Sequence, residues 1–294
     1  MHVGGQAVLE GVMLRGKKFW VVSVRKQDLT IVQKKSEIKN ISKKYPIFSK
    51  PIFRGVISLY EAISLGVEAL NFSAVESSDE DMKISKKEIG ISFTIAIIIS
   101  IVAFIIFPSS LAKYFENNFS TLENVFILNL FEGLLRVIIF ISYILAISMI
   151  KDIRRVFEYH GAEHKVIHAY EEDVELTTEN VQKYSTVHVR CGTSFIIIVL
   201  ILMIFVFSLL GRPSILLRIL YRIILIPVIA GLSYEIVKLS GKHQNNIFIR
   251  ILIYPGLLIQ KLTTKEPDNE QVEVALKSLN YLLELENNGV EEKI

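Results

Sequence analysis

The chain has 294 residues, of which 51% are hydrophobic and 21% are charged, and its mean hydropathy is +0.43. A soluble domain of this length rarely averages so apolar, which argues against an ordinary cytosolic enzyme fold. The formal net charge of +3 is too small to indicate nucleic-acid binding, and a single cysteine, Cys191, excludes an internal disulfide. The composition therefore predicts an α-helical integral membrane protein with no nucleic-acid partner.

Residues 1–88 predict a cytosolic region with a small β part followed by a helix. No apolar core stands next to a small-residue cleavage site here, so no signal peptide is expected. After four glycines in the first sixteen residues, two β-rich runs flank Lys26, Gln27 and Asp28, which predicts a β-hairpin or small sheet. Residues 51–72 carry apolar side chains at helical spacing and predict an amphipathic helix that lies on the membrane or on the β part.

Residues 89–260 predict a membrane domain, because they contain apolar stretches of the length that a bilayer requires. About four transmembrane helices are expected, at about 89–107, 125–150, 194–211 and 215–237. No glycine or proline interrupts 151–160, so the second helix is expected to continue past the membrane. The shorter stretch 247–260 contains Arg250, Pro255 and Gly256, which favours an interfacial or re-entrant segment.

Basic residues predict the orientation in the membrane. Six of them lie in the loop 151–193, whereas the links 108–124 and 212–214 contain one each. By the positive-inside rule, this loop and both termini face the cytoplasm. Residues 261–294 predict a cytosolic C-terminal helix that is capped by Asp268 or Asn269.

The loop 151–193 also carries four of the six histidines and the cysteine. On a helix, His160 and His164 are one turn apart and project together, as two ligands of one ion must. His188 and Cys191 supply a second pair at the spacing of metal sites, and imidazole with thiolate suits zinc. The loop therefore predicts a closed zinc site made by these four side chains.

A second interpretation makes the site catalytic. The run from His160 to His164 matches H-x-x-E-H, in which two histidines bind zinc and the glutamate, here Glu163, activates water. A downstream carboxylate, Glu171 or Glu172, would then complete an open three-ligand site, with Cys191 outside it. The alternative ligands are His168, Glu171 and Glu172. A third interpretation is that the histidines only cap, hydrogen-bond or lie near lipid headgroups.

Charged residues also occur inside the predicted transmembrane helices. Glu132 and Arg136 are one turn apart in the second helix, and Arg218 and Arg222 are one turn apart in the fourth. Because a charge at such depth costs about 2.5–3.5 kcal/mol on insertion scales, these residues are expected to pair or to reach the interface. A structural ion pair is favoured over a binding site for an anionic lipid or peptide group.

Three motifs in order resemble the YqhQ-like family of bacterial multi-span membrane proteins: GGQAVLEGVMLRG, FEYHGAEHKVIHAYE and LTTENVQKYSTVHVRCGTSF. The resemblance covers nearly the whole chain. That uncharacterised family is labelled as predicted metal-dependent enzymes, so the resemblance implies a metal-dependent activity in the bacterial cytoplasmic (inner) membrane. Members usually have a proline where this chain has Val189.

Two functional hypotheses follow, and both include contact with membrane lipids. The first is a metal-dependent hydrolase that acts on a lipid-linked or peptide substrate at the inner leaflet. The second is a non-enzymatic scaffold or assembly factor, in which zinc ties the loop to the β part and a membrane-protein partner docks. An enzyme leaves one metal position open for water, whereas a structural site is closed by four protein ligands.

Overall fold

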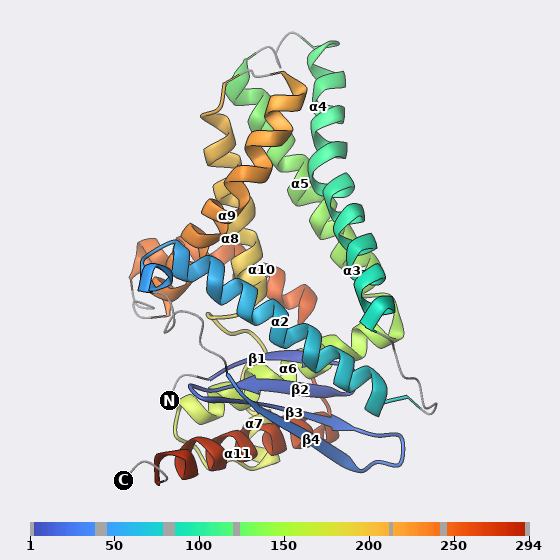
Figure 1. Ribbon diagram of the computed structural model, residues 1–294, viewed down its shortest axis with the longest axis vertical. Coiled ribbons are helices and arrows are strands. Elements are labelled where there is room, and N and C mark those ends of the chain that lie inside the picture. The colour runs from blue at the N-terminus through green and yellow to red at the C-terminus, as the bar shows by residue number, and fades with distance from the viewer. Residues whose placement is uncertain are drawn as a thin grey trace.

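The computed structural model describes residues 3–38, 46–78, 86–119, 124–211, 214–241 and 246–291. The β-sheet and the helices that pack on it lie at one end of the molecule and the long apolar helices at the other (Figure 1). The helix α2 (Phe53–Glu76), which follows a short 3-10 turn at Pro46–Ser49, lies across the junction between the two ends.

The β-rich start of the chain forms a small antiparallel sheet, as predicted. Each strand pairs with the next in chain order. The strands are β1 (Gly4–Val8), β2 (Gly11–Arg15), β3 (Phe19–Arg25) and β4 (Ile31–Glu37). The predicted hairpin joins β3 to β4. The glycine-containing stretch before it adds the other two strands.

The two central strands of the sheet, β2 and β3, are buried on both faces. In β2 and β3, Leu14 and Val21 enter one core, whereas Met13 and Trp20 enter another that includes Ala69 of α2. A strand that is covered on both sides shows a continuous apolar run instead of an alternating pattern, which explains the sequence of β3. The amphipathic helix expected at 51–72 is therefore α2, and it packs on the β part.

The other face of the sheet packs against α6 (Lys151–Glu171) and α11 (Asn269–Glu291), and the short helix α7 (Thr178–Gln182) lies beside them. Asp268 caps α11: its Oδ1 accepts from the Gln271 amide at 2.8 Å, and Gln271 Oε1 accepts from the Asp268 amide at 2.9 Å. This reciprocal capping box fixes the start of the predicted C-terminal helix.

Within the described residues, three helices are long and apolar enough to cross a membrane: Gly90–Glu116, Val125–Ile147 and Ile219–Ser240. The first comprises α3 (Lys86–Ile101), a π-helical turn (Val102–Ile106) and α4 (Phe107–Glu116); the others are α5 (Val125–Ile147) and most of α9 (Ile215–Ser240). The third predicted span is the shorter apolar helix α8 (Gly192–Ser208). These apolar helices are compatible with a membrane protein.

The expectation that the second helix continues beyond residue 150 is wrong. The helix α5 ends at Ile147, and Ile150 is extended, with φ −78° and ψ 126°, before α6 begins. The break redirects the chain so that Tyr159, Ala162 and Val166 are fully buried in the core under the sheet. Tertiary packing thus outweighs local helical propensity here.

The stretch 247–260 forms most of one continuous helix, α10 (Ile247–Thr263), which contains Pro255. It packs closely against the start of α8, because a Cβ at Gly256 would lie 2.8 Å from the Ser194 Cα. Its C-terminal end is thereby held next to the residues that precede α8.

A buried charge cluster joins α4, α5 and α9. Glu132 is fully buried and pairs with both Arg136 and Arg222, with 2.6 Å between Glu132 Oε2 and Arg222 Nη2. Arg136 Nε also donates to the Phe104 carbonyl at 2.9 Å. In an α-helix this carbonyl would accept from the amide of residue 108, but Pro108 has no N–H. The side chain of Arg218 lies outside the described part of the structure.

Replacing Glu132 should destabilise the helix bundle. In Glu132→Gln, two buried guanidinium groups lose their counter-charge, so a loss of about 3–5 kcal/mol is expected. Thermal unfolding in detergent measures it, with Glu116→Gln as the control because Glu116 pairs locally with Lys113 near the helix end. Equal unfolding temperatures for the two variants would contradict a stabilising role for the cluster.

Candidate metal centre

The site is built on α6, where His160 and His164 follow each other by one turn. Their ring centroids are 4.5 Å apart. The helix can approach the segment after α10 because Gly161 has no side chain. A Cβ at this position would lie 2.0 Å from the Lys265 carbonyl oxygen. This close packing brings the end of α10 to the first histidine.

A backbone carbonyl holds each imidazole by its Nδ1. His160 Nδ1 lies 2.9 Å from the Thr263 oxygen, and His164 Nδ1 lies 2.5 Å from the Thr186 oxygen. Carbonyl oxygens only accept, so Nδ1 carries the proton in both rings and Nε2 has the free lone pair. Burial also holds the pKa of His164 well below its usual value, which favours the neutral ring. Metal-ligating histidines are oriented in this way.

Cys191 lies opposite the two histidines, directly before α8. Its Sγ is 3.2 Å from His160 Nε2 and accepts from the Thr193 amide at 3.4 Å as the N-cap of the helix. One ligand atom each from His160, His164 and Cys191 lies within 4.8 Å of the other two. Burial raises the pKa of the Cys191 thiol, so the thiolate form there requires a nearby cation.

His188 lies beside this group but not in it. Its ring centroid is 5.8 Å from that of His164, and its Nε2 lies 3.3 Å from Glu171 Oε2. Burial lowers the pKa of His188 to about 4. The structure therefore brings three of the four residues of the predicted closed site together and turns the fourth towards a carboxylate.

The three alternative ligands make their contacts outside the group of His160, His164 and Cys191. His168 Nε2 donates to the Val187 carbonyl at 2.9 Å, and Glu171 pairs with Arg190 as well as with His188. Glu172 is exposed at the C-terminal end of α6. In this structure Cys191, which the open-site interpretation placed outside, is the third member of the compact group.

Glu163 lies in the same cavity as the three ligands. Its side chain is buried, and burial, partly offset by His160, raises its pKa to about 8. Its carboxyl contacts strand β1, where a Cβ at Gly5 would lie 2.7 Å from Glu163 Oε1. Glycine at this position lets the strand cover the carboxyl group, which keeps bulk water away from it.

The cavity has a volume of about 950 Å³ and lies between β1, α6, α9 and the segment 188–193. Its charged lining groups include three basic side chains, Arg15, Arg190 and Lys238, and the carboxyl group of Glu163. Arg15 pairs with Glu61 at 2.7 Å. The cavity therefore combines donors for a metal with a basic wall.

Sequence reasoning missed the contribution of α10. Gln260 is buried, its Oε1 accepts from the His188 amide at 2.8 Å, and its Nε2 donates to the His188 carbonyl at 2.8 Å and to Ser194 Oγ at 2.6 Å. This clamp holds the turn from His188 to Cys191. One signal was available: Gln260 is an uncharged polar residue at the end of an apolar stretch.

These features define a helical protein with membrane-length apolar helices and a histidine–cysteine cluster at one end of them. The chain belongs to the family described as protein of unknown function (DUF1385), whose model matches residues 50–285. It is 40% identical over 296 residues to the uncharacterized protein YqhQ of Bacillus subtilis (strain 168). The alignment covers 96% of this chain and 92% of the relative. The resemblance to the YqhQ-like family is confirmed, and no solved structure matches.

Loss of the Gln260 clamp should expose the thiol of Cys191. In Gln260→Leu, the His188 amide loses its partner and the His188 carbonyl keeps only the Cys191 amide, at 3.3 Å. An unsatisfied buried donor costs about 1–3 kcal/mol locally, which corresponds to roughly tenfold faster opening. Maleimide labelling of EDTA-treated protein reports this directly because Cys191 is the sole cysteine. Gln27→Leu, at an exposed position, is the control. An unchanged labelling rate in Gln260→Leu would mean that the turn is held by other contacts.

Proposed function

We propose that the protein is a zinc-dependent hydrolase at the cytoplasmic face of the bacterial inner membrane. The observation that carries this proposal is the compact group of His160, His164 and Cys191, with Glu163 in the same cavity. Three protein ligands leave one coordination position for water, which is the arrangement of catalytic zinc sites.

The donor set fits zinc. Two imidazole Nε2 atoms and one thiolate are borderline and soft ligands, and both imidazoles are already oriented by backbone carbonyls. Zinc bound here would lower the pKa of a coordinated water and polarise the bond to be cleaved. Burial raises the thiol pKa of Cys191, so a bound cation is what would favour its thiolate form.

Glu163 is the proposed general base. It follows His160 by three residues on α6 and directly precedes His164, so its carboxyl lies near both ligands without being one of them. With a pKa of about 8 the carboxyl is protonated at neutral pH in the metal-free site, and the positive charge of bound zinc would favour the carboxylate. In hydrolysis the carboxylate accepts the proton of the attacking water, whose oxygen bonds to the electrophilic atom. The bond to the leaving group breaks, and Glu163 returns the proton to that group.

A structural zinc site in a scaffold protein is the second candidate, and the position of His188 favours it. Its ring is near enough to His164 to become a fourth ligand after a side-chain rotation. Against this, His188 Nε2 already faces Glu171, and Nδ1 accepts from the Arg190 amide at 3.3 Å. The open site needs no such rearrangement.

The proposed topology places both termini and the segment 151–193 in the cytoplasm. The sheet, α6 and α11 lie at one end of the molecule and α4 extends to the other (Figure 1). The helix α10 then lies at the cytoplasmic interface, with exposed apolar side chains such as Phe248 and Ile251.

Glu163→Gln tests the hydrolase. The variant should keep its zinc and its fold but fail to complement a deletion strain, because a general base contributes about 10²–10⁴-fold to a rate. Zinc content and complementation are measured on the same variant, with Glu172→Gln at the exposed end of α6 as the control. A zinc-replete Glu163→Gln protein that complements fully would exclude the hydrolase and leave the scaffold.

Cysteine labelling tests the topology. In a Cys191→Ser background, Asn117→Cys should react with a membrane-impermeant maleimide from the outside of intact cells, and Glu179→Cys only after permeabilisation. Both positions suit the test because Asn117 follows α4 and Glu179 is exposed on α7. Labelling of residue 179 in intact cells would reverse the proposed orientation.

A further inference from the structure

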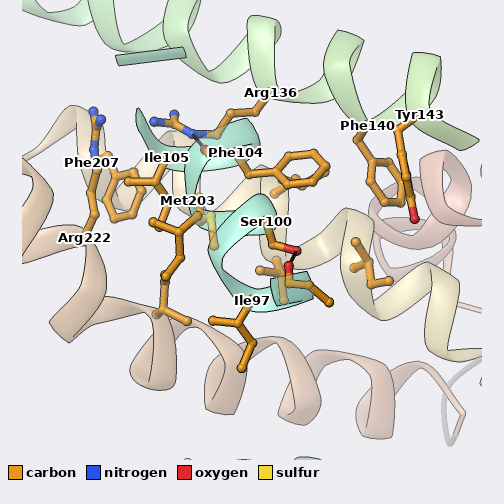
Figure 2. Close-up of a pocket in the computed structure, with 16 residues that line it drawn as sticks. Ile97, Ser100, Phe104, Ile105, Arg136, Phe140, Tyr143, Met203, Phe207 and Arg222 are labelled. Carbon is orange, nitrogen blue, oxygen red and sulfur yellow. Dashed lines mark hydrogen bonds between the residues drawn. The ribbon is translucent and has the colours of Figure 1, made fainter. Parts of the chain in front are cut away.

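An apolar slot opens among the membrane-length helices. It has a volume of about 550 Å³ and lies between α3, α5, α8 and α9 (Figure 2). Its wall is almost wholly hydrocarbon and aromatic, with Ile97, Phe104, Phe140, Tyr143, Ile196 and Met203 among the lining residues. The volume is in the range of ligand pockets, and a wall this apolar offers water few hydrogen-bond partners.

Phe207 and two arginines line the end of the slot away from the metal centre. Phe207 lies there, with the Arg222 guanidinium carbon 5.1 Å and the Arg136 carbon 5.8 Å from its ring centroid. Glu132 takes up the charge of both arginines, so the free polarity that they offer the slot is limited to Arg222 Nε, which has no hydrogen-bond partner in the described part of the structure. A ligand that fills the slot is therefore a hydrocarbon chain, which the bilayer supplies.

The other end of the slot meets the metal cavity. Ile196 lines both cavities, and Tyr143 of the slot is followed by Ile144 of the metal cavity. At about 1.5 Å per residue along α8, Ile196 lies roughly 7 Å from Cys191. This distance is on the scale of a lipid headgroup, so one molecule can reach from the slot to the ligands.

The metal cavity is charged to suit an anionic headgroup. Lys238 lines it, and so do Arg15 and Arg190, which are ion-paired with Glu61 and Glu171. Lys238 is in the last turn of α9, at the rim where the membrane surface is expected. Basic side chains at such a surface attract anionic lipids.

We propose that the slot and the metal cavity together hold one anionic phospholipid, with an acyl chain in the slot and the phosphate headgroup in the cavity. The inference rests on the proposed hydrolase in one respect, namely that this lipid is its substrate. Seating of the lipid itself requires neither zinc nor Glu163.

The experiment uses the full chain in detergent and a phosphatidylglycerol probe with a diazirine on its acyl chain. After illumination, labelled peptides should map to residues that line the slot. Met203→Trp fills the slot and should reduce this labelling roughly tenfold. Ser100→Phe, from the opposite wall, is a second filling variant in case the first does not fold. Ile138→Trp is the control, because Ile138 is on α5, is exposed and is not among the slot residues.

Competition tests the headgroup. Unlabelled phosphatidylglycerol should displace the probe better than phosphatidylcholine, and Lys238→Gln should reduce that preference. Equal competition by both lipids would overturn the claim that the cavity prefers an anionic headgroup. Labelling spread evenly over the lipid-facing helices, and unaffected by Met203→Trp and Ser100→Phe, would overturn the slot.

Glu163→Gln separates this inference from the hydrolase. Slot labelling in that variant should persist and should remain sensitive to Met203→Trp. If the slot is labelled while Glu163→Gln complements, the lipid site stands and the hydrolase fails. If Glu163→Gln abolishes function while the slot is never labelled, the hydrolase stands and the phospholipid substrate is wrong.

Discussion

Two hydrogen bonds from imidazole Nδ1 atoms to backbone carbonyls determine which histidine atoms can bind a metal in this site. The Thr263 and Thr186 carbonyls accept from Nδ1 of His160 and His164, so both Nε2 atoms are directed into one cavity. Thr263 is the last residue of α10, where helix carbonyls have no intrahelical donor. His160 on α6 thus donates to the last carbonyl of α10. This hydrogen bond holds two helices that are far apart in the sequence in one arrangement.

The local pattern in the sequence was sufficient for the parts of the site that lie on one helix. The spacing of His160, Glu163 and His164 predicts their common location on α6, and the β-rich runs predict the sheet. The partners from other elements could not be predicted in the same way. Whether Cys191 or Glu171 joins the two histidines depends on the turn that Gln260 holds, and Gln260 is distant in sequence.

The helix break at Ile150 illustrates the same limit. No residue between 151 and 160 disfavours a helix, so the local sequence predicts continuation. The chain turns because the apolar face of α6 packs against both the sheet and α11, a contact that involves both ends of the sequence. As a result, α6 lies under the sheet with its histidines next to α10 and the start of α8. The slot between the membrane-length helices meets the site at that place.

X-ray absorption at the zinc K edge of the purified protein tests the central claim most directly. The account predicts one sulfur at about 2.3 Å, two imidazole nitrogens at about 2.0–2.1 Å and one light atom without imidazole scattering, and the sulfur contribution should vanish in Cys191→Ser. A shell of one sulfur and three imidazoles would show that His188 closes the site, as a structural zinc would require. A shell without sulfur would contradict the ligand group itself.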